Sequence, residues 1–294
     1  SSEAHEYWKK AAIYYYIARF PFVGSPAKQV AYEKHINAYL NYAKSFNTPL
    51  EIVKIPFQGK EVIGYLRIPE VKNPPIVVVT GGVDTWKSDV DVMIEPLLEQ
   101  GLAVFAFDMP GTGESEWALS PENDKVYSAV FDYLKKDQRI DGNRIGLYEM
   151  SFGGYYSIRL ALSNPDVKAV INVGGPVSLS FGKDNIKKVP DVMVATIAHA
   201  MGVNEQSSVD KLAELVKPFD LDKPGFLQNP VYNPHILSIN GEKDELVPIE
   251  DLYIISQRGV KQEEWVYPES GHCALELADQ WSEKAAIWMK DKLQ

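Results

Sequence analysis

The sequence predicts an α/β protein with a mainly parallel sheet, and three observations support this. Six short apolar runs, from IVVVT at residue 76 to EEWVY at residue 263, recur along the chain. Helical patterns lie between most of them, as parallel strands require. Two alternating runs, EIVKIPF and EVIGYLRIP, come first and are joined by QGK, which is typical of a hairpin. We therefore predict a parallel sheet covered by helices on both faces, with antiparallel strands leading at one edge.

Two regions of the chain have helical patterns but do not alternate with strands. EAHEYWKKAAIYYYIARF and AKQVAYEKHINAYLNYAKSF place apolar residues at three- and four-residue spacings, and PFVGSP breaks between them. Residues 176–230 show helical and irregular patterns without a convincing strand. We predict a core formed by residues 50–175 and 231–294. Residues 1–49 and 176–230 are expected to form a helical cap over the carboxyl edge of the sheet, where open α/β sheets bind ligands.

Composition and charge disfavour several kinds of partner and binding site. The net charge of −10 disfavours nucleic acid as a partner, because phosphate binding needs clustered Lys and Arg. The single cysteine, Cys273, excludes an internal disulfide and a cysteine-rich metal site, and agrees with a cytoplasmic protein. No apolar run approaches the roughly 18 residues of a membrane span. We expect a small-molecule carbonyl substrate and no membrane or nucleic-acid partner; homodimer formation is left open.

The stretch GLYEMSFGGYY, residues 146–156, predicts a strand that enters a helix through a tight turn centred on Ser151. A serine in such a turn is held outward at a helix N-terminus, where developing negative charge is stabilised. The turn usually has the pattern G-x-S-x-G. Gly153 fills the later glycine position, but Glu149 occupies the earlier one.

Two further residues complete a candidate triad. In hydrolases with this turn, an acid follows the serine and a histidine comes last. INGEKDELVP places Asp244 just beyond one strand, and YPESGHCALE places His272 between another strand and the final helix. Asp244 is preferred to Glu242 and Glu245 because it lies on a short turn directly after the strand. The order serine, acid, histidine is the expected one.

Acyl transfer also needs backbone donors for the oxyanion. One expected donor is the amide of Phe152, directly after the serine. The other is expected in GGVDTWKSD, the loop after IVVVT, where glycines allow close approach of the backbone. The sequence leaves both Gly82 and Val83 open for this second donor.

Taken together, these motifs resemble the α/β-hydrolase superfamily, and within it the esterases of the fermentation–respiration switch protein (FrsA) type. That group includes polyketide chain-shortening hydrolases and dihydroxypseudooxynicotine hydrolase. The resemblance spans most of the chain and rests on EYWKKAAIYYYIA, TGGVDTWKSD, FDMPGTGES, SFGGYY and SGH. It implies an α/β-hydrolase fold with a helical cap, a buried pocket and a triad of Ser151, His272 and Asp244. It implies no metal or organic cofactor.

Glu149 departs from the family pattern, which has a small residue there. Two roles are open for its carboxylate: it can raise the pKa of a nearby His272, or it can compete with Asp244 for that histidine. We predict that Glu149 tunes the site without abolishing activity.

The leading functional hypothesis is a serine hydrolase acting on carboxylic esters. The first alternative is a C–C bond hydrolase of the retro-Claisen type, acting on a β-diketone or polyketide-like substrate with the same triad. The second is a non-catalytic binding or regulatory protein with this fold, which only Glu149 favours.

Overall fold

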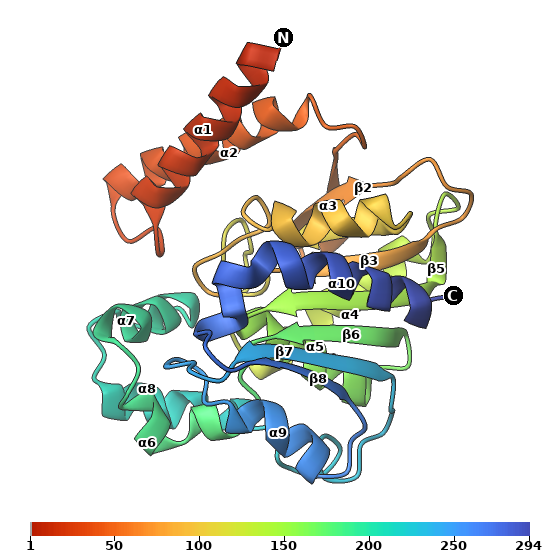
Figure 1. Cartoon of the computed structure of the whole chain (residues 1–294). Coiled ribbons are helices and arrows are strands. Elements are labelled where there is room, and N and C mark those ends of the chain that lie inside the picture. The colour runs from red at the N-terminus through yellow and green to blue at the C-terminus, as the bar shows by residue number, and fades with distance from the viewer. Residues whose placement is uncertain (1) are drawn as a thin grey trace.

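The computed structural model describes residues 2–294 and contains one sheet of eight strands in the order β1-β2-β4-β3-β5-β6-β7-β8 (Figure 1). The β1–β2 and β2–β4 pairs are antiparallel, and all later pairs are parallel. The predicted fold class, with its leading hairpin at one edge, is confirmed. The strands are β1 (Glu51–Phe57), β2 (Lys60–Arg67), β3 (Pro75–Thr80), β4 (Ala103–Phe107), β5 (Asp141–Met150), β6 (Val167–Val173), β7 (His235–Gly241) and β8 (Glu263–Tyr267).

Burial along the strands explains their sequences. Every residue of β3 and β4 is buried, as expected for central strands covered on both faces. The edge strand β1 alternates between exposed and buried positions, so it shows the polar and apolar alternation seen in its sequence.

Helices cover both faces of the sheet (Figure 1). On one face lie α3 (Asp91–Glu99) and α10 (Ala278–Lys292), which pack against each other and bury their apolar residues with those of β3, β5 and β6. On the other lie α4 (Lys125–Leu134), α5 (Phe152–Ser163) and α9 (Glu250–Gln257), whose apolar side chains join the larger core. Two short 3₁₀ turns flank these helices: η1 (Pro121–Asp124) comes before α4, and η4 (His272–Leu277) comes before α10.

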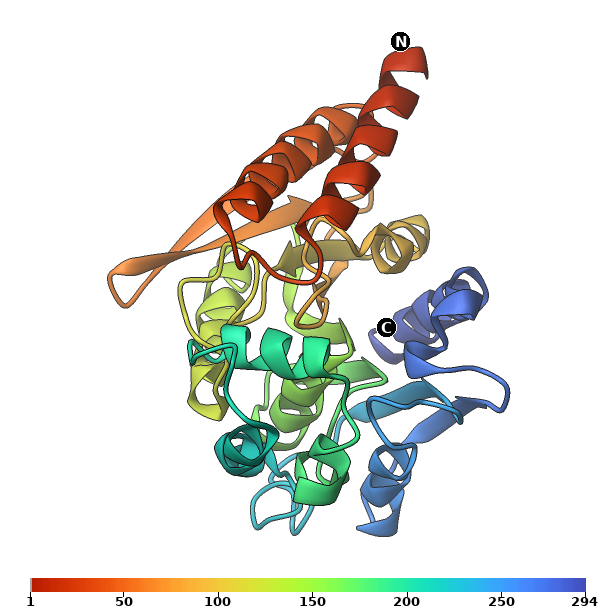
Figure 2. The same cartoon turned by 90° about the vertical axis from the view of Figure 1, so that its left-hand side faces the viewer.

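The N-terminal residues form an antiparallel helical hairpin of α1 (Ser2–Arg19) and α2 (Pro26–Ala43) beside β2 and α3 (Figures 1 and 2). Helix α2 begins where Ser25 caps it by accepting a hydrogen bond from the Lys28 amide, with Pro26 in the first turn. Tyr39 of α2 stacks on Tyr65 of β2, with ring centroids 5.8 Å apart, so the hairpin has a small apolar contact of its own with the sheet.

Residues 176–230 contain helices and no strand, as predicted, apart from an isolated bridge between Pro224 and Gln228. The elements are η2 (Leu179–Phe181), α6 (Lys183–Ile186), α7 (Asp191–Ala200), α8 (Val209–Val216) and η3 (Lys217–Phe219). They lie beyond the carboxyl ends of the parallel strands (Figures 1 and 2). Their function as a cap stays a prediction. Within residues 2–294, no helix is both long and apolar enough to cross a membrane.

Candidate active site

Ser151 lies between the last residue of β5 and the first residue of α5, in a strained conformation with φ 53° and ψ −129°. Its amide donates to the carbonyl of Val173 at 2.7 Å, and its carbonyl accepts from the amide of Gly154 at 2.8 Å. A Cβ at position 153 would lie 2.4 Å from the carbonyl oxygen of Gly81. The turn is therefore tight enough to require glycine two residues after the serine. This tight turn holds the Ser151 hydroxyl outward.

His272 and Asp244 reach this serine from the ends of two other strands. His272 begins η4 after β8, and Asp244 follows β7. Nδ1 of His272 lies 2.7 Å from Oδ2 of Asp244, and Nε2 lies 2.9 Å from Oγ of Ser151. A carboxylate only accepts, so Nδ1 carries the hydrogen of its bond and Nε2 is left to accept from the serine hydroxyl. The structure thus brings the three sequence-predicted residues into one chain of hydrogen bonds.

Asp244 is held by several donors in addition to the histidine. Its Oδ1 accepts from the amides of Leu246 and Val247 at 2.8 and 3.0 Å, and its Oδ2 accepts from Nδ2 of Asn240 at 2.9 Å. Oδ1 of Asn240 also accepts from the amide of Cys273 at 2.9 Å. Asn240 therefore ties the acid to the histidine turn. The sequence did not predict this role of Asn240, although a polar residue near the end of the buried strand HILSING was a usable signal.

These contacts shift the pKa values of Asp244 and His272. Burial by itself raises the pKa of Asp244, but hydrogen bonds from His272, Val247 and Asn240 outweigh it and hold the pKa below its ordinary value. Burial by itself lowers the pKa of His272, but the neighbouring Cys273 and the hydrogen bond to Asp244 outweigh it and raise the pKa well above its ordinary value. These contacts thus favour the carboxylate form of Asp244 and make the His272 imidazole a stronger base.

The loop after β3, residues 81–90, lies against the serine; we call it the oxyanion loop. A Cβ at Gly82 would lie 2.8 Å from Cβ of Ser151 and 3.0 Å from its Oγ, so only glycine allows this approach. The amides of Phe152 and Val83 donate no hydrogen bond in the part of the chain that the structure describes. Val83 lines the cavity beside Ser151, whereas Gly82 does not, which favours Val83 over Gly82 as the second donor.

The cavity at Ser151 has a volume of about 50 Å³ and an almost entirely apolar lining. Most of this lining comes from residues 176–230, beyond the strand ends. Asp251 of α9 fixes the beginning of that segment, accepting hydrogen bonds from the amides of Val177, Ser178, Leu179 and Ser180 at 2.6 to 3.1 Å. No sequence signal identified this role. The apolar lining residues are Val83, Phe152, Pro176, Phe181, Ile186, Val189, Met193, Ile197, Val216, Leu246 and Val247.

Glu149 lies beneath the turn and is fully buried. Thr80 of β3, Tyr127 of α4 and Ser157 of α5 surround its carboxyl group, and burial raises its pKa well above the ordinary value. Neither carboxyl oxygen has a close hydrogen-bond partner among the described residues. In this arrangement His272 pairs with Asp244, and Glu149 is not among the main causes of the shift in the histidine pKa. Neither role that the sequence left open for Glu149, raising the His272 pKa or competing with Asp244, is supported by its position.

Two further side chains that can carry chemistry, Cys273 and His199, have structural surroundings. Cys273 is buried, with its Sγ 3.3 Å from the carbonyl oxygen of Val173. His199 of α7 stacks on Phe22 and contacts Glu205, outside the cavity at Ser151. Within residues 2–294, no cluster of three or more His, Cys, Asp or Glu side chains is arranged to hold a metal ion.

Comparison with known proteins places this chain in a family. The family model described as "Esterase FrsA-like" matches residues 1–293. The chain belongs to the FrsA-like esterase family. Esterase FrsA of Vibrio cholerae serotype O1 is 28% identical over 294 residues, covering 96% of this chain and 70% of that protein. The 2,6-dihydropseudooxynicotine hydrolase of Paenarthrobacter nicotinovorans is 26% identical over 276 residues, covering 90% of this chain and 71% of that protein.

Solved structures agree with this membership. A crystal structure of 2,6-dihydroxy-pseudo-oxynicotine hydrolase superposes with a TM-score of 0.85 at 25% identity, covering 98% of this chain and 80% of that one. AbyA5 superposes with a TM-score of 0.84 at 21% identity, covering 98% and 87%, and this likeness shows the fold alone. The family comparisons confirm the predicted resemblance and the prediction of an enzyme of the hydrolase class. They do not favour a non-catalytic binding protein.

Proposed function

We propose that the protein is a serine hydrolase that cleaves carboxylic esters. Ser151 is the nucleophile, His272 the general base and Asp244 the acid that orients the histidine. The observation that carries this proposal is the unbroken chain of hydrogen bonds from Asp244 through His272 to Ser151. Family membership supports the reaction class, since relatives along most of the chain are named esterases and hydrolases.

The reaction follows from these positions. Oγ of Ser151 forms a bond to the carbonyl carbon while its proton passes to Nε2 of His272. The carbonyl oxygen gains negative charge, which the amides of Phe152 and Val83 stabilise. The carbon–oxygen bond to the alcohol then breaks, the alcohol leaves with the proton from His272, and an acyl ester remains on Ser151. Water, deprotonated by His272, attacks this ester; the bond between the acyl carbon and Oγ then breaks, Ser151 takes the proton back from His272, and the acid is released.

The cavity indicates the type of acyl group. Apart from Ser151, Ser180 and His272, the lining is apolar and offers no charged partner for a substrate carboxylate or amine, so an uncharged acyl group fits best. At about 50 Å³, the cavity accommodates a short acyl chain more readily than a long one. We therefore propose short, uncharged acyl esters as the preferred substrate class.

A C–C bond hydrolase is the second candidate. The observation in its favour is that one relative covering 90% of this chain is named as a hydrolase of 2,6-dihydropseudooxynicotine and not as an esterase. The same attack by Ser151 on a ketone would release an enolate in place of an alcohol, and His272 would donate the proton to its carbon.

A substrate panel separates the two candidates. Purified protein is tested with p-nitrophenyl acetate, butyrate and octanoate and with a set of β-diketones, and Ser151→Ala serves as the control for each. We expect turnover of the short esters, little turnover of octanoate and none of the diketones. Diketone cleavage that exceeds ester hydrolysis in kcat/KM, and is lost in the control, would favour the C–C reaction.

A further inference from the structure

The oxyanion loop is held in place by the N-terminal hairpin. Arg19, the last residue of α1, is fully buried between the hairpin and this loop. Its Nη1 donates to the carbonyl of Asp84 at 2.7 Å, and its Nη2 forms an ion pair with Asp89. One guanidinium group thus binds both limbs of the loop, on the two sides of its tip.

The same guanidinium group reaches the candidate oxyanion donor through Trp86. It lies 3.7 Å from the centre of the Trp86 ring, and the Trp86 amide donates to Oδ2 of Asp89 at 2.8 Å. The indole Nε1 of Trp86 donates to the carbonyl of Val83 at 3.3 Å. The path from Arg19 to the Val83 backbone therefore contains a single intervening side chain.

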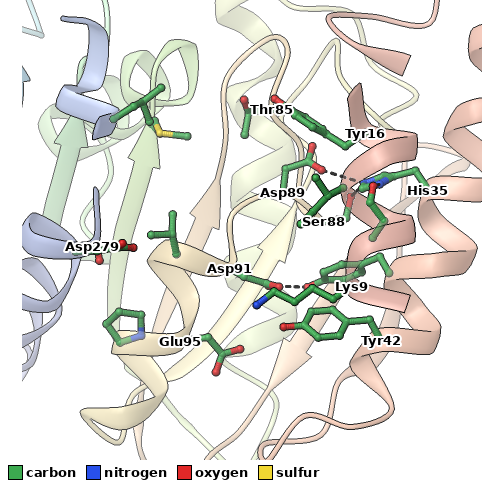
Figure 3. A pocket seen from close by; sticks show the side chains of 18 of the residues that line it. Lys9, Tyr16, His35, Tyr42, Thr85, Ser88, Asp89, Asp91, Glu95 and Asp279 are labelled. Atoms are coloured by element: carbon green, nitrogen blue, oxygen red, sulfur yellow. Dashed lines mark hydrogen bonds and ion pairs between the residues drawn. The ribbon is translucent and has the colours of Figure 1, made fainter. Parts of the chain in front are cut away.

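His35 of α2 reinforces this attachment (Figure 3). Its Nε2 lies 2.9 Å from Oδ1 of Asp89 and 2.8 Å from Oγ of Ser88, while its Nδ1 lies 2.9 Å from the carbonyl of Ala12 in α1. The figure shows Ser88 and Asp89 of the loop directed toward His35 and Tyr16 of the hairpin. Both helices of the hairpin thus hold the loop by polar contacts.

We propose that Arg19 is a positioning residue that holds the oxyanion loop, and with it the Val83 amide, in the geometry that stabilises the transition state. This inference rests on the proposed function. Oxyanion donors act because they are fixed before charge develops, and losing one costs about 10² to 10³ in kcat. Displacing one donor without removing it should cost less.

Arg67 is a matched control for Arg19. It is also buried, it stacks on Phe46 at 4.3 Å from the ring centre, and it pairs with Glu95. Its Nε donates to the carbonyl of Thr48, in the connection that leads from the hairpin to β1. Arg67 therefore joins the N-terminal region to the sheet as Arg19 does, but away from the oxyanion loop.

Removing Arg19 alone takes the guanidinium partner from the buried Asp89 carboxylate and leaves only His35 and the Trp86 amide beside it, which can prevent folding. The double variant Arg19→Met/Asp89→Asn avoids this, because the asparagine oxygen can still accept from the Trp86 amide. The conservative variant Arg19→Lys keeps the charge but cannot bind both limbs of the loop and stack on Trp86 together.

The experiment measures kcat and KM for p-nitrophenyl acetate per active site titrated with a fluorophosphonate, together with Tm and the inhibition constant of a trifluoromethyl ketone. We expect Arg19→Met/Asp89→Asn to lower kcat about 10- to 100-fold with KM nearly unchanged, and to weaken the ketone by a similar factor. Arg19→Lys should fall between it and the wild type. Arg67→Met should lower Tm while kcat stays within about twofold of wild type.

Two outcomes separate this inference from the proposed function. Ser151→Ala without turnover, together with wild-type kcat in Arg19→Met/Asp89→Asn, would overturn the inference alone. Intact turnover in Ser151→Ala would overturn the proposed function and the inference with it. A fall in kcat that is equal for the Arg19 and Arg67 variants at equal Tm loss would mean that Arg19 is merely structural, and would also overturn the inference.

Discussion

The two helical regions beside the active site are attached to the molecule in different ways. The α1–α2 hairpin contacts the oxyanion loop through buried charged and polar groups, chiefly Arg19 and His35 with Asp89. Residues 176–230 are held at their beginning by Asp251 and beyond it mainly by apolar packing, since α7 and α8 contribute Val194 and Leu212 to the same core as α4 and α5. Ionic contacts fix direction and distance, whereas apolar packing tolerates changes of shape. The hairpin is therefore suited to hold catalytic geometry, and the 176–230 segment to shape the pocket.

The largest effect on turnover should come from Ser151, which belongs to neither helical region. Ser151→Ala should lower turnover by about 10⁶, because the nucleophile of a triad acts as part of a unit. Changes in either helical region should remain far smaller. The measurement is ester hydrolysis by purified variant, with circular dichroism as a control for folding. Retention of most of the activity would remove Ser151 from the site.

Asp244→Asn should have the next largest effect, a fall in kcat of about 10⁴, because the histidine then loses its orienting carboxylate.

His272 must be neutral to act as a base, and its pKa is raised in the folded protein. Activity of the wild type should therefore fall as the pH drops through a midpoint above the ordinary histidine pKa of about 6.5.

Asp244→Asn should also shift the pH at which activity falls on the acid side, the acid limb of the pH profile. Without the carboxylate that raises the histidine pKa, the acid limb of kcat/KM in Asp244→Asn should lie at lower pH than in the wild type. The measurement is kcat/KM against pH for both proteins on one ester. A limb at the same pH in both would mean that Asp244 does not tune His272.

Substitutions in α7 and α1 test whether residues 176–230, and not the hairpin, determine the preference for acyl-chain length. Met193 and Ile197 of α7 line the cavity at Ser151, so Met193→Ala and Ile197→Ala should enlarge it. The ratio of kcat/KM for hexanoate to that for acetate should rise about tenfold, since each methylene in a pocket is worth a factor of this order. Ile13→Ala in α1 is the hairpin control, because Ile13 lies outside this cavity. Equal ratios in all variants would contradict a pocket shaped by α7.

The smallest effect concerns Glu149 and is one of stability. Its pKa is raised in the folded protein, so the folded state binds the proton more tightly than the unfolded chain does. Stability linked to this group is thus fully present below the unfolded pKa of about 4.3 and is lost as the pH rises. Glu149→Gln should remove this loss and become relatively more stable as the pH rises.

This prediction is checked by Tm from pH 5 to 8 for Glu149→Gln and the wild type. The difference in Tm should grow with pH, while the acid limb of kcat/KM should coincide for the two proteins. A shift of that limb in Glu149→Gln would restore the sequence-based hypothesis that Glu149 tunes His272.

The sequence predicted those features that depend on local pattern and chain order. The strands were visible as apolar runs, and Ser151, Asp244 and His272 were predicted as a triad because each follows a strand in an order that the fold fixes. The position of Glu149 relative to His272 stayed open, because sequence gives its distance from Ser151 along the chain, but not the face of β5 that it occupies. It faces α4 and α5, the layer that packs under the turn.

Long-range partners were beyond sequence reasoning. Arg19 appeared only as a basic residue ending a helix, and its partners Asp84 and Asp89 are 65 and 70 residues away. Asp251 likewise has the appearance of an ordinary acid in the first turn of α9, although it holds amides more than 70 residues earlier. Such contacts depend on how elements pack, and a single sequence carries no signal for them.

Covalent labelling tests the central claim, that Ser151 is an activated nucleophile, most directly. The protein is incubated with a fluorophosphonate, its intact mass is measured, and the modified peptide is mapped by mass spectrometry. We expect one adduct per chain on Ser151, blocked by prior denaturation and absent from Ser151→Ala. No adduct in the folded wild type, or an adduct on another residue that persists in Ser151→Ala, would contradict the claim.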